Sequence, residues 1–324
     1  MTDGPRLAMA GLVAARVAAE TATFQRDVAW ARLAERQGSS EQSGAPAWTP
    51  PVERIETGTF PEAHFENPVV PGALRIALVA TPRTGNTWVR TLLAEAFDLD
   101  QVAVHAPTGI PWTDLPARLV VQLHWHRLPC FRNALVRSGF RIVTIARNPI
   151  DVLVSVLQFR QSEPTTEFWL SGEGGNEDSL VGAEPGSGAF RAWAVSDRAR
   201  ALLSVSVEWS SDQESIRVRY EDFVLNPGAS LLALTRQLDA DPVRDPRTLG
   251  EQLSLEEMRR RFTATPGHFW KGQPGLGLAV LDSGAAREIV EAHESVFRSL
   301  SYSHSVPPRT VEQAVAAWTR LAAG

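Results

Sequence analysis

The chain has 324 residues, enough for one large domain with appended segments, and its composition excludes several functional classes. Because its formal net charge is −5, we expect no general affinity of the whole molecule for nucleic acid or anionic membranes. A single cysteine, Cys130, excludes an internal disulfide and is typical of a reducing compartment, so the sequence predicts a cytoplasmic protein. No apolar run approaches 18 residues, and no membrane span is predicted.

Two segments precede the first predicted strand. Residues 1–36 predict an amphipathic helix that packs on its own domain or on a second subunit, so a homodimer is one possibility. An export signal over residues 7–15 is the alternative, but Arg16 interrupts it. Residues 37–73 are rich in Gly, Ser, Glu and Pro, which predicts an extended surface linker. The remainder, 74–324, is predicted to form one domain.

The stretch 74–93 predicts a buried strand, a tight loop and a helix. The loop TPRTGNTW (81–88) joins a strand to a helix N-terminus, an arrangement that binds anions. The pattern for nucleoside triphosphates, G-x-x-x-x-G-K-[ST], would need Gly at Ala80 and Lys at Asn86. The cation here is Arg83 instead, which favours a ligand with a single 5′-phosphate carrying one further group. A plain strand-to-helix turn is the alternative.

A second strand and helix are predicted over RIVTIARNPIDVLVSV (141–156). The strand delivers Arg147 to the start of a helix that begins with proline, and Ser155 follows eight residues later. Open α/β sheets bind ligands at the carboxyl ends of parallel strands, which is where Arg147 falls. A nucleotide kinase would have Asp here to hold Mg²⁺. Arginine therefore predicts direct phosphate binding with no metal.

The segment 161–188 is long and rich in Gly, Ser and acidic residues. It predicts either a lid over a bound substrate, anchored by Phe168 and Trp169, or a disordered surface loop. The other elements predicted after it are a helix over 189–209, a strand over 216–220, and helices over 284–300 and 309–322.

The order of these motifs resembles the cytosolic-type sulfotransferases. The loop 81–88 followed by ARNPIDVLVSV (146–156) carries the resemblance. Three later segments agree with it: VRYEDF (218–223), LSLEEM (253–258) and WKGQPG (270–275). The resemblance implies an α/β fold, a P-loop-like three-layer sandwich with a central parallel sheet flanked by helices. It also implies transfer of a sulfuryl group from 3′-phosphoadenosine 5′-phosphosulfate (PAPS) to a hydroxyl, which leaves 3′-phosphoadenosine 5′-phosphate (PAP).

The resemblance places a catalytic histidine at the end of the strand LVVQLHWHR (119–127), about 22 residues ahead of the arginine that binds the 3′-phosphate. His124 lies 23 residues ahead of Arg147 and His126 lies 21 ahead, so the spacing does not choose between them. Alignment of the strand end favours His124 as the general base, with His126 as the alternative. Imidazole suits the role because its unperturbed pKa is about 6.5.

Arg83 stands where the family usually has lysine. Arginine stays protonated and makes a forked contact with oxyanions, so we predict that it is an electrostatic catalyst and not an acid. The resemblance implies a larger set of donor-binding residues: Arg83, Thr84, Gly85, Asn86, Thr87, Trp88, Arg147, Ser155, Tyr220, Leu255, Lys271 and Gly272. Leu255 replaces a common aromatic, which favours Trp88 as the stacking face for adenine.

Three functional hypotheses follow from the sequence. The first is a PAPS-dependent sulfotransferase acting on the hydroxyl of a small, partly apolar or glycosylated molecule. The second is a nucleotide-dependent phosphotransferase, which the missing lysine and aspartate oppose. The third is a non-catalytic PAP-binding protein. The Ala- and Arg-rich composition is typical of high-GC bacteria, where such enzymes often modify products of secondary metabolism.

Overall fold

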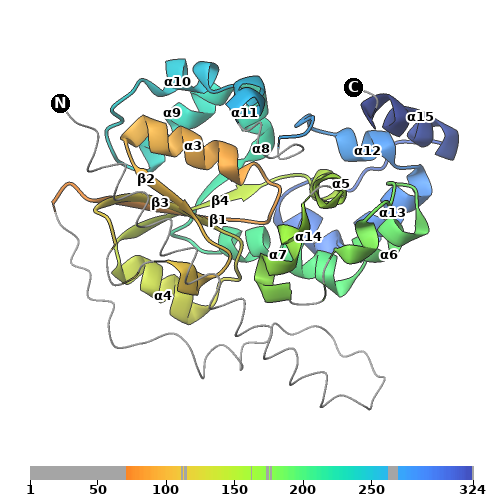
Figure 1. Ribbon diagram of the computed structural model, residues 1–324, viewed down its shortest axis with the longest axis horizontal. Helices are drawn as coiled ribbons and strands as arrows, with labels where there is room; N and C mark the ends of the chain where they lie inside the picture. The colour runs from red at the N-terminus through yellow and green to blue at the C-terminus, as the bar shows by residue number, and fades with distance from the viewer. Residues whose placement is uncertain are drawn as a thin grey trace, which may run out of the picture.

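The computed structural model in Figure 1 describes residues 71–110, 112, 115–161, 163–172, 175, 177–261 and 269–322. The predicted helix 1–36 and nearly all of the predicted linker 37–73 lie outside these residues. The described chain contains one parallel sheet in the order β2-β3-β1-β4-β5. Its strands are β1 (Leu74–Val79), β2 (Asp100–Ala103), β3 (Arg118–Leu123), β4 (Phe140–Ala146) and β5 (Ile216–Arg219).

Helices cover both faces of the sheet, so the predicted fold class is confirmed (Figure 1). One face carries α3 (Asn86–Phe97), α8 (Tyr220–Leu225), α9 (Pro227–Gln237), α10 (Pro246–Gln252) and α11 (Leu255–Arg261). The other carries α4 (Pro129–Arg137) and α7 (Asp197–Ser210). Beside them lie α5 (Pro149–Arg160), α6 (Gly188–Ala194), α12 (Leu276–Val280), α13 (Ser283–Ala292), α14 (Glu294–Ser299) and α15 (Val311–Ala322).

The central strand β1 shows why both layers are needed. All six of its residues are buried, as expected for a parallel strand covered on two sides. Ile76 and Leu78 belong to the apolar cluster under α3, whereas Ala77 and Val79 belong to the cluster on the opposite face. This alternation follows from the two-residue period of a strand.

Some predicted boundaries were wrong. β3 ends at Leu123, four residues before the predicted end, and the chain then leaves the sheet before α4. The predicted helix 189–209 is two helices, because Ser196 caps α7 by accepting a hydrogen bond from the Ala199 N–H. The predicted helix 284–300 is likewise divided at His293 into α13 and α14.

A buried ion pair fixes part of the segment 161–188. This segment contains two 3-10 helices, η2 (Pro164–Gly172) and η3 (Asp178–Leu180). Arg198 of α7 donates to Glu177 Oε1 at 2.7 Å, and these two side chains are 2% and 0% exposed. The same guanidinium donates to the Trp169 carbonyl at 3.0 Å. Arg198 therefore anchors the backbone that carries Trp169.

We predict that Glu177→Ala lowers the free energy of unfolding by about 3–5 kcal/mol, because it leaves the Arg198 guanidinium buried without a countercharge. Urea denaturation followed by circular dichroism measures the change. The matched control is Glu288→Ala, which removes an ion pair with Arg191 whose side chains are 44% and 45% exposed. It should cost less than about 1 kcal/mol. Equal effects of the two substitutions would contradict the assignment.

Candidate functional site

The candidate site lies at the carboxyl ends of the three central strands. The loop after β1 carries Arg83, the chain after β3 carries His124, and the chain after β4 carries Arg147. All three residues line one cavity of about 430 Å³. β1 and β4 are neighbours in the sheet. The chain leaves β1 toward β2 at one edge and leaves β4 toward β5 at the other, so the connections diverge at this point. Crevices of this kind are the common ligand sites of open α/β sheets.

The loop between β1 and α3 is held by its own side chains. The Thr84 hydroxyl donates to the Thr81 carbonyl at 2.8 Å, and Asn86 Nδ2 donates to the same carbonyl at 2.9 Å. Gly85 has a φ of 93°, and a Cβ there would lie 2.6 Å from Tyr220 Cδ2. Glycine is therefore required both by the backbone conformation and by the close approach of Tyr220. The loop leads directly into the N-terminus of α3, whose first N–H groups have no acceptor within the helix.

Two guanidinium groups lie on aromatic rings in the cavity wall. The Arg83 guanidinium lies 4.3 Å from the centre of the Phe159 ring, and its Nε donates to the Ser155 hydroxyl at 3.2 Å. The Arg147 guanidinium lies 4.3 Å from the Tyr220 ring centre and donates to the Arg83 carbonyl at 2.8 Å. These contacts orient both cations.

The electrostatics of the cavity favour an anion. Burial, followed by the positive charge of Arg147, lowers the pKa of Arg83 to about 9. Among the described residues that line the cavity, none is Asp or Glu. The buried Nε of Arg147 also has no hydrogen-bond partner in the described part of the chain. A bound polyanion would stabilise both charges.

The late loop predicted to contact the 3′-phosphate forms another part of the wall. The Tyr220 hydroxyl donates to the Gly272 carbonyl at 2.8 Å. Gly272 has a φ of 67°, a backbone conformation that favours glycine. Asp151 of α5 accepts hydrogen bonds from the N–H groups of Gly275 and Gly277 at 2.7 and 2.6 Å. The loop is thereby attached to the helix that follows Arg147.

His124 is in the state that a general base requires. Its Nδ1 lies 2.7 Å from the Ala80 carbonyl, which only accepts hydrogen bonds, so Nδ1 carries the proton and Nε2 carries a lone pair. Burial lowers the pKa of His124 to about 4, and the ring is neutral at pH 7. The edge of Trp169 packs against it with ring centres 6.0 Å apart.

His126 lies outside the cavity lining. Its Nδ1 is 2.9 Å from Glu208 Oε1, and only 4% of the residue is exposed. Burial alone would raise the pKa of the Glu208 carboxyl, but hydrogen bonds from His126, the Arg127 N–H and Ser204 outweigh it and hold this pKa below its usual range. The structure thus gives the two histidines different surroundings, a difference that their spacing in the sequence did not reveal.

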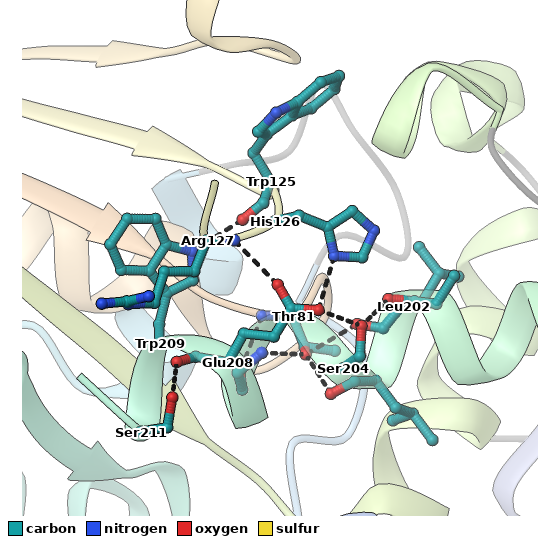
Figure 2. A network of polar contacts seen from close by, with 12 residues as sticks. Thr81, Trp125, His126, Arg127, Leu202, Ser204, Glu208, Trp209 and Ser211 are labelled. Carbon is teal, nitrogen blue, oxygen red and sulfur yellow. Dashed lines mark hydrogen bonds and ion pairs between the residues drawn. The ribbon is translucent and has the colours of Figure 1, made fainter. Parts of the chain in front are cut away.

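Helix α7 connects the ends of all three central strands, and Figure 2 shows its contacts with the chain after β1 and after β3. Glu208 accepts from the Arg127 N–H at 2.9 Å, and Trp209 Nε1 donates to the Trp125 carbonyl at 2.8 Å. The Ser206 hydroxyl accepts from the Thr81 N–H and donates to the Ile145 carbonyl, both at 2.8 Å. Because the three strands carry Arg83, His124 and Arg147, one helix fixes the relative positions of these groups.

Most of the predicted site residues line the cavity together: Arg83, Gly85, Asn86, Thr87, Trp88, His124, Arg147, Ser155, Tyr220, Leu255 and Gly272. Thr84 and Lys271 do not line it; Thr84 supports the loop from within, and the Lys271 carbonyl accepts a hydrogen bond from Arg259. Trp88 is only 2% exposed and donates from Nε1 to the Leu253 carbonyl, so most of its ring is covered by protein. Its stacking role stays a prediction.

Sequence reasoning missed several lining residues. Arg90 and Phe159 each follow a predicted site residue by four positions in a helix, after Asn86 and Ser155 respectively, so helical spacing could have found them. His105 and Gln122 had no such signal, because their approach depends on the pairing of β2 with β3.

The comparisons agree with the architecture described above. No family model and no curated protein sequence matches the chain. Mouse sulfotransferase SULT7A1, solved in complex with PAP, is similar in structure, with a TM-score of 0.53 and 16% identity over 78% of this chain and 89% of that chain. The chain has the fold of a sulfotransferase.

Two structures of retinol dehydratase are similar at a lower level, with TM-scores below 0.5. One contains androsterone and the inactive cofactor PAP, with 12% identity, a TM-score of 0.47 and coverage of 69% of this chain and 80% of that one. The other contains retinol and PAP, with 12% identity, a TM-score of 0.46 and coverage of 69% and 81%.

Two features are absent from the described residues. They contain no group of three or more His, Cys, Asp or Glu side chains that could hold a metal ion. No helix in the same part of the chain has the length and apolar character needed to cross a membrane.

We predict that Ser206→Ala lowers the free energy of unfolding by about 1–3 kcal/mol, because the buried Thr81 N–H loses its acceptor. Urea denaturation measures the loss. Ser211→Ala is the matched control at the C-terminal cap of the same helix, since Ser211 is exposed and its hydroxyl donates to the nearby Glu208 carbonyl. A Ser206→Ala protein as stable as this control would show that α7 does not hold the strand ends.

Proposed function

We propose that the protein transfers a sulfuryl group from PAPS to a hydroxyl of a small-molecule acceptor. The observation that carries the proposal is the composition of one cavity: Arg83 and Arg147 lie beside a neutral His124, and the described lining contains no carboxylate. Fixed cations and a base are what this reaction needs from a protein. The sulfotransferase fold supports the proposal without establishing the activity.

The residues present fit a ligand with separate phosphates. We assign the 5′ end of PAPS to residues 83–88, at the N-terminus of α3, and the 3′-phosphate to Arg147, Ser155 and the loop at 271–272. Arg147 and Ser155 both line the cavity, so their side chains can meet a ligand placed there. PAPS supplies an activated sulfuryl group, joined to the 5′-phosphate through a bridging oxygen.

The chemistry assigned to the chain is one in-line displacement. The acceptor oxygen forms a bond to sulfur while the bond from sulfur to the bridging oxygen breaks, and the hydroxyl proton passes to His124 Nε2. Arg83 and the N–H groups at the start of α3 screen the charge that develops on the departing phosphate. Even with a pKa of about 9, Arg83 stays protonated at pH 7, so its assigned role is that of a fixed positive charge.

We predict that His124→Gln lowers kcat for sulfuryl transfer by about 10²–10⁴-fold, because the attacking hydroxyl loses its base. The wild-type pH profile provides a second readout. Since the pKa of His124 is lowered to about 4, kcat/KM should stay level from neutral pH to about pH 5 and fall as the ring is protonated below about pH 4. A radiolabelled sulfuryl donor and a library of hydroxyl compounds measure both.

The matched control is His126→Gln, two residues away and outside the cavity lining. Circular dichroism at each pH separates loss of the base from acid unfolding. Retention of full activity by His124→Gln would remove the assigned mechanism. Turnover only with a nucleoside triphosphate and Mg²⁺ would replace the proposed function by phosphoryl transfer.

We predict that PAP at one hundred times its dissociation constant stabilises the fold by about 2.7 kcal/mol. Arg147→Ala should remove most of this stabilisation, because the buried guanidinium is assigned to the 3′-phosphate. The control is Arg219→Ala: Arg219 also lies on a tyrosine ring, that of Tyr302, but does not line the cavity. Thermal unfolding with and without PAP measures the shift. If PAP stabilises neither the wild type nor the control, the proposed function fails.

A further inference from the structure

The cavity extends beyond the residues assigned to the donor. Arg147 and Tyr220 come from the ends of β4 and β5, on one side of β1. On the other side, Gln122 lies near the end of β3 and His105 follows β2, and both line the same cavity. His124 follows β3 and belongs to this second side, so it is the group that meets an acceptor placed there.

Arg90 of α3 is the cation of this second side. Among the described residues its hydrogen-bond partner is the neutral amide oxygen Gln101 Oε1, at 3.2 Å. Burial lowers the pKa of Arg90 to about 10. The described lining offers it no carboxylate. A partly desolvated guanidinium without a countercharge is costly, and an anion supplied by a ligand would offset the cost.

Gln122 adds a second unsatisfied group. It is 8% exposed, it lines the cavity, and its buried Oε1 has no hydrogen-bond partner in the described chain. The amide nitrogen of the same side chain carries two N–H donors that an oxyanion accepts. Val104, Phe159 and Trp169 line the cavity as well and provide apolar contact surface.

We propose that Arg90 and Gln122 form a subsite for an anionic group of the acceptor, so that the preferred substrates are aromatic or apolar hydroxy compounds that also carry a carboxylate or a similar oxyanion. The subsite deepens the proposed function and rests on it. His124 receives the hydroxyl proton while Arg90 binds the oxyanion at the other end of the same molecule. The apolar residues that line the same cavity contact its hydrocarbon part.

The test uses matched probes of increasing length: 4-hydroxybenzoate, 4-hydroxyphenylacetate and 3-(4-hydroxyphenyl)propionate, each compared with its primary amide. In the wild type, the kcat/KM of the best carboxylate should exceed that of its amide by about tenfold to a hundredfold, the worth of a charge-assisted hydrogen bond. Arg90→Gln should bring this ratio close to one. Arg244→Gln is the control, because its guanidinium pairs with Glu95 and Gln252 and does not line the cavity.

Calorimetry with the same probes, with and without PAP, tests the subsite independently of transfer. The carboxylates should bind more tightly than the amides, and Arg90→Gln should remove the difference while PAP affinity is retained. The proposal is overturned by a ratio near one for every pair, by a preference that survives Arg90→Gln, or by an equal loss of PAP affinity, which would assign Arg90 to the donor. Carboxylate preference in binding without sulfated product would refute the proposed function alone.

Discussion

The candidate site depends on keeping two guanidinium groups close together in a cavity whose described lining has no carboxylate. Arg83 and Arg147 repel each other, and the repulsion contributes to the low pKa of Arg83. Four contacts offset this repulsion. Each guanidinium lies on an aromatic ring, Arg83 donates to the Ser155 hydroxyl, and Arg147 donates to the Arg83 carbonyl. Such preorganised charge lowers the energy of a state in which an anion arrives or develops, because the groups need not reorganise.

The rest of the fold supplies the rigidity that this arrangement requires. Parallel pairing places the ends of β1, β3 and β4 at one edge, and the buried side chains of α7 join these ends by hydrogen bonds. Asp151 attaches the late loop to α5 in a similar way. Each connection pairs a main-chain group, so the polar contacts satisfy the backbone and position the site together.

How much could be predicted from the sequence depended on how local each feature is. The loop 81–88 and Arg147 could be predicted to lie at the site, because an anion-binding loop and a strand end are both recognisable from short continuous stretches of sequence. The choice between His124 and His126 needed three dimensions, because it depends on where β3 ends and which ring meets the Ala80 carbonyl. Arg90, His105 and Gln122 converge only when β2, β3 and α3 pack together, and no short pattern records that packing.

The hydrogen bond between His124 and Ala80 has a consequence for the reaction cycle. Many histidine bases are oriented by an acidic side chain, which stabilises the ring once it is positive; here the orienting group is a main-chain dipole. Burial and the positive charges of Arg83 and Arg90 disfavour an imidazolium at this position, and the hydrogen bond to Ala80 offsets only part of that cost. In the reaction proposed for this site, the ring would therefore lose its proton readily, and no dedicated relay would be needed to restore the base.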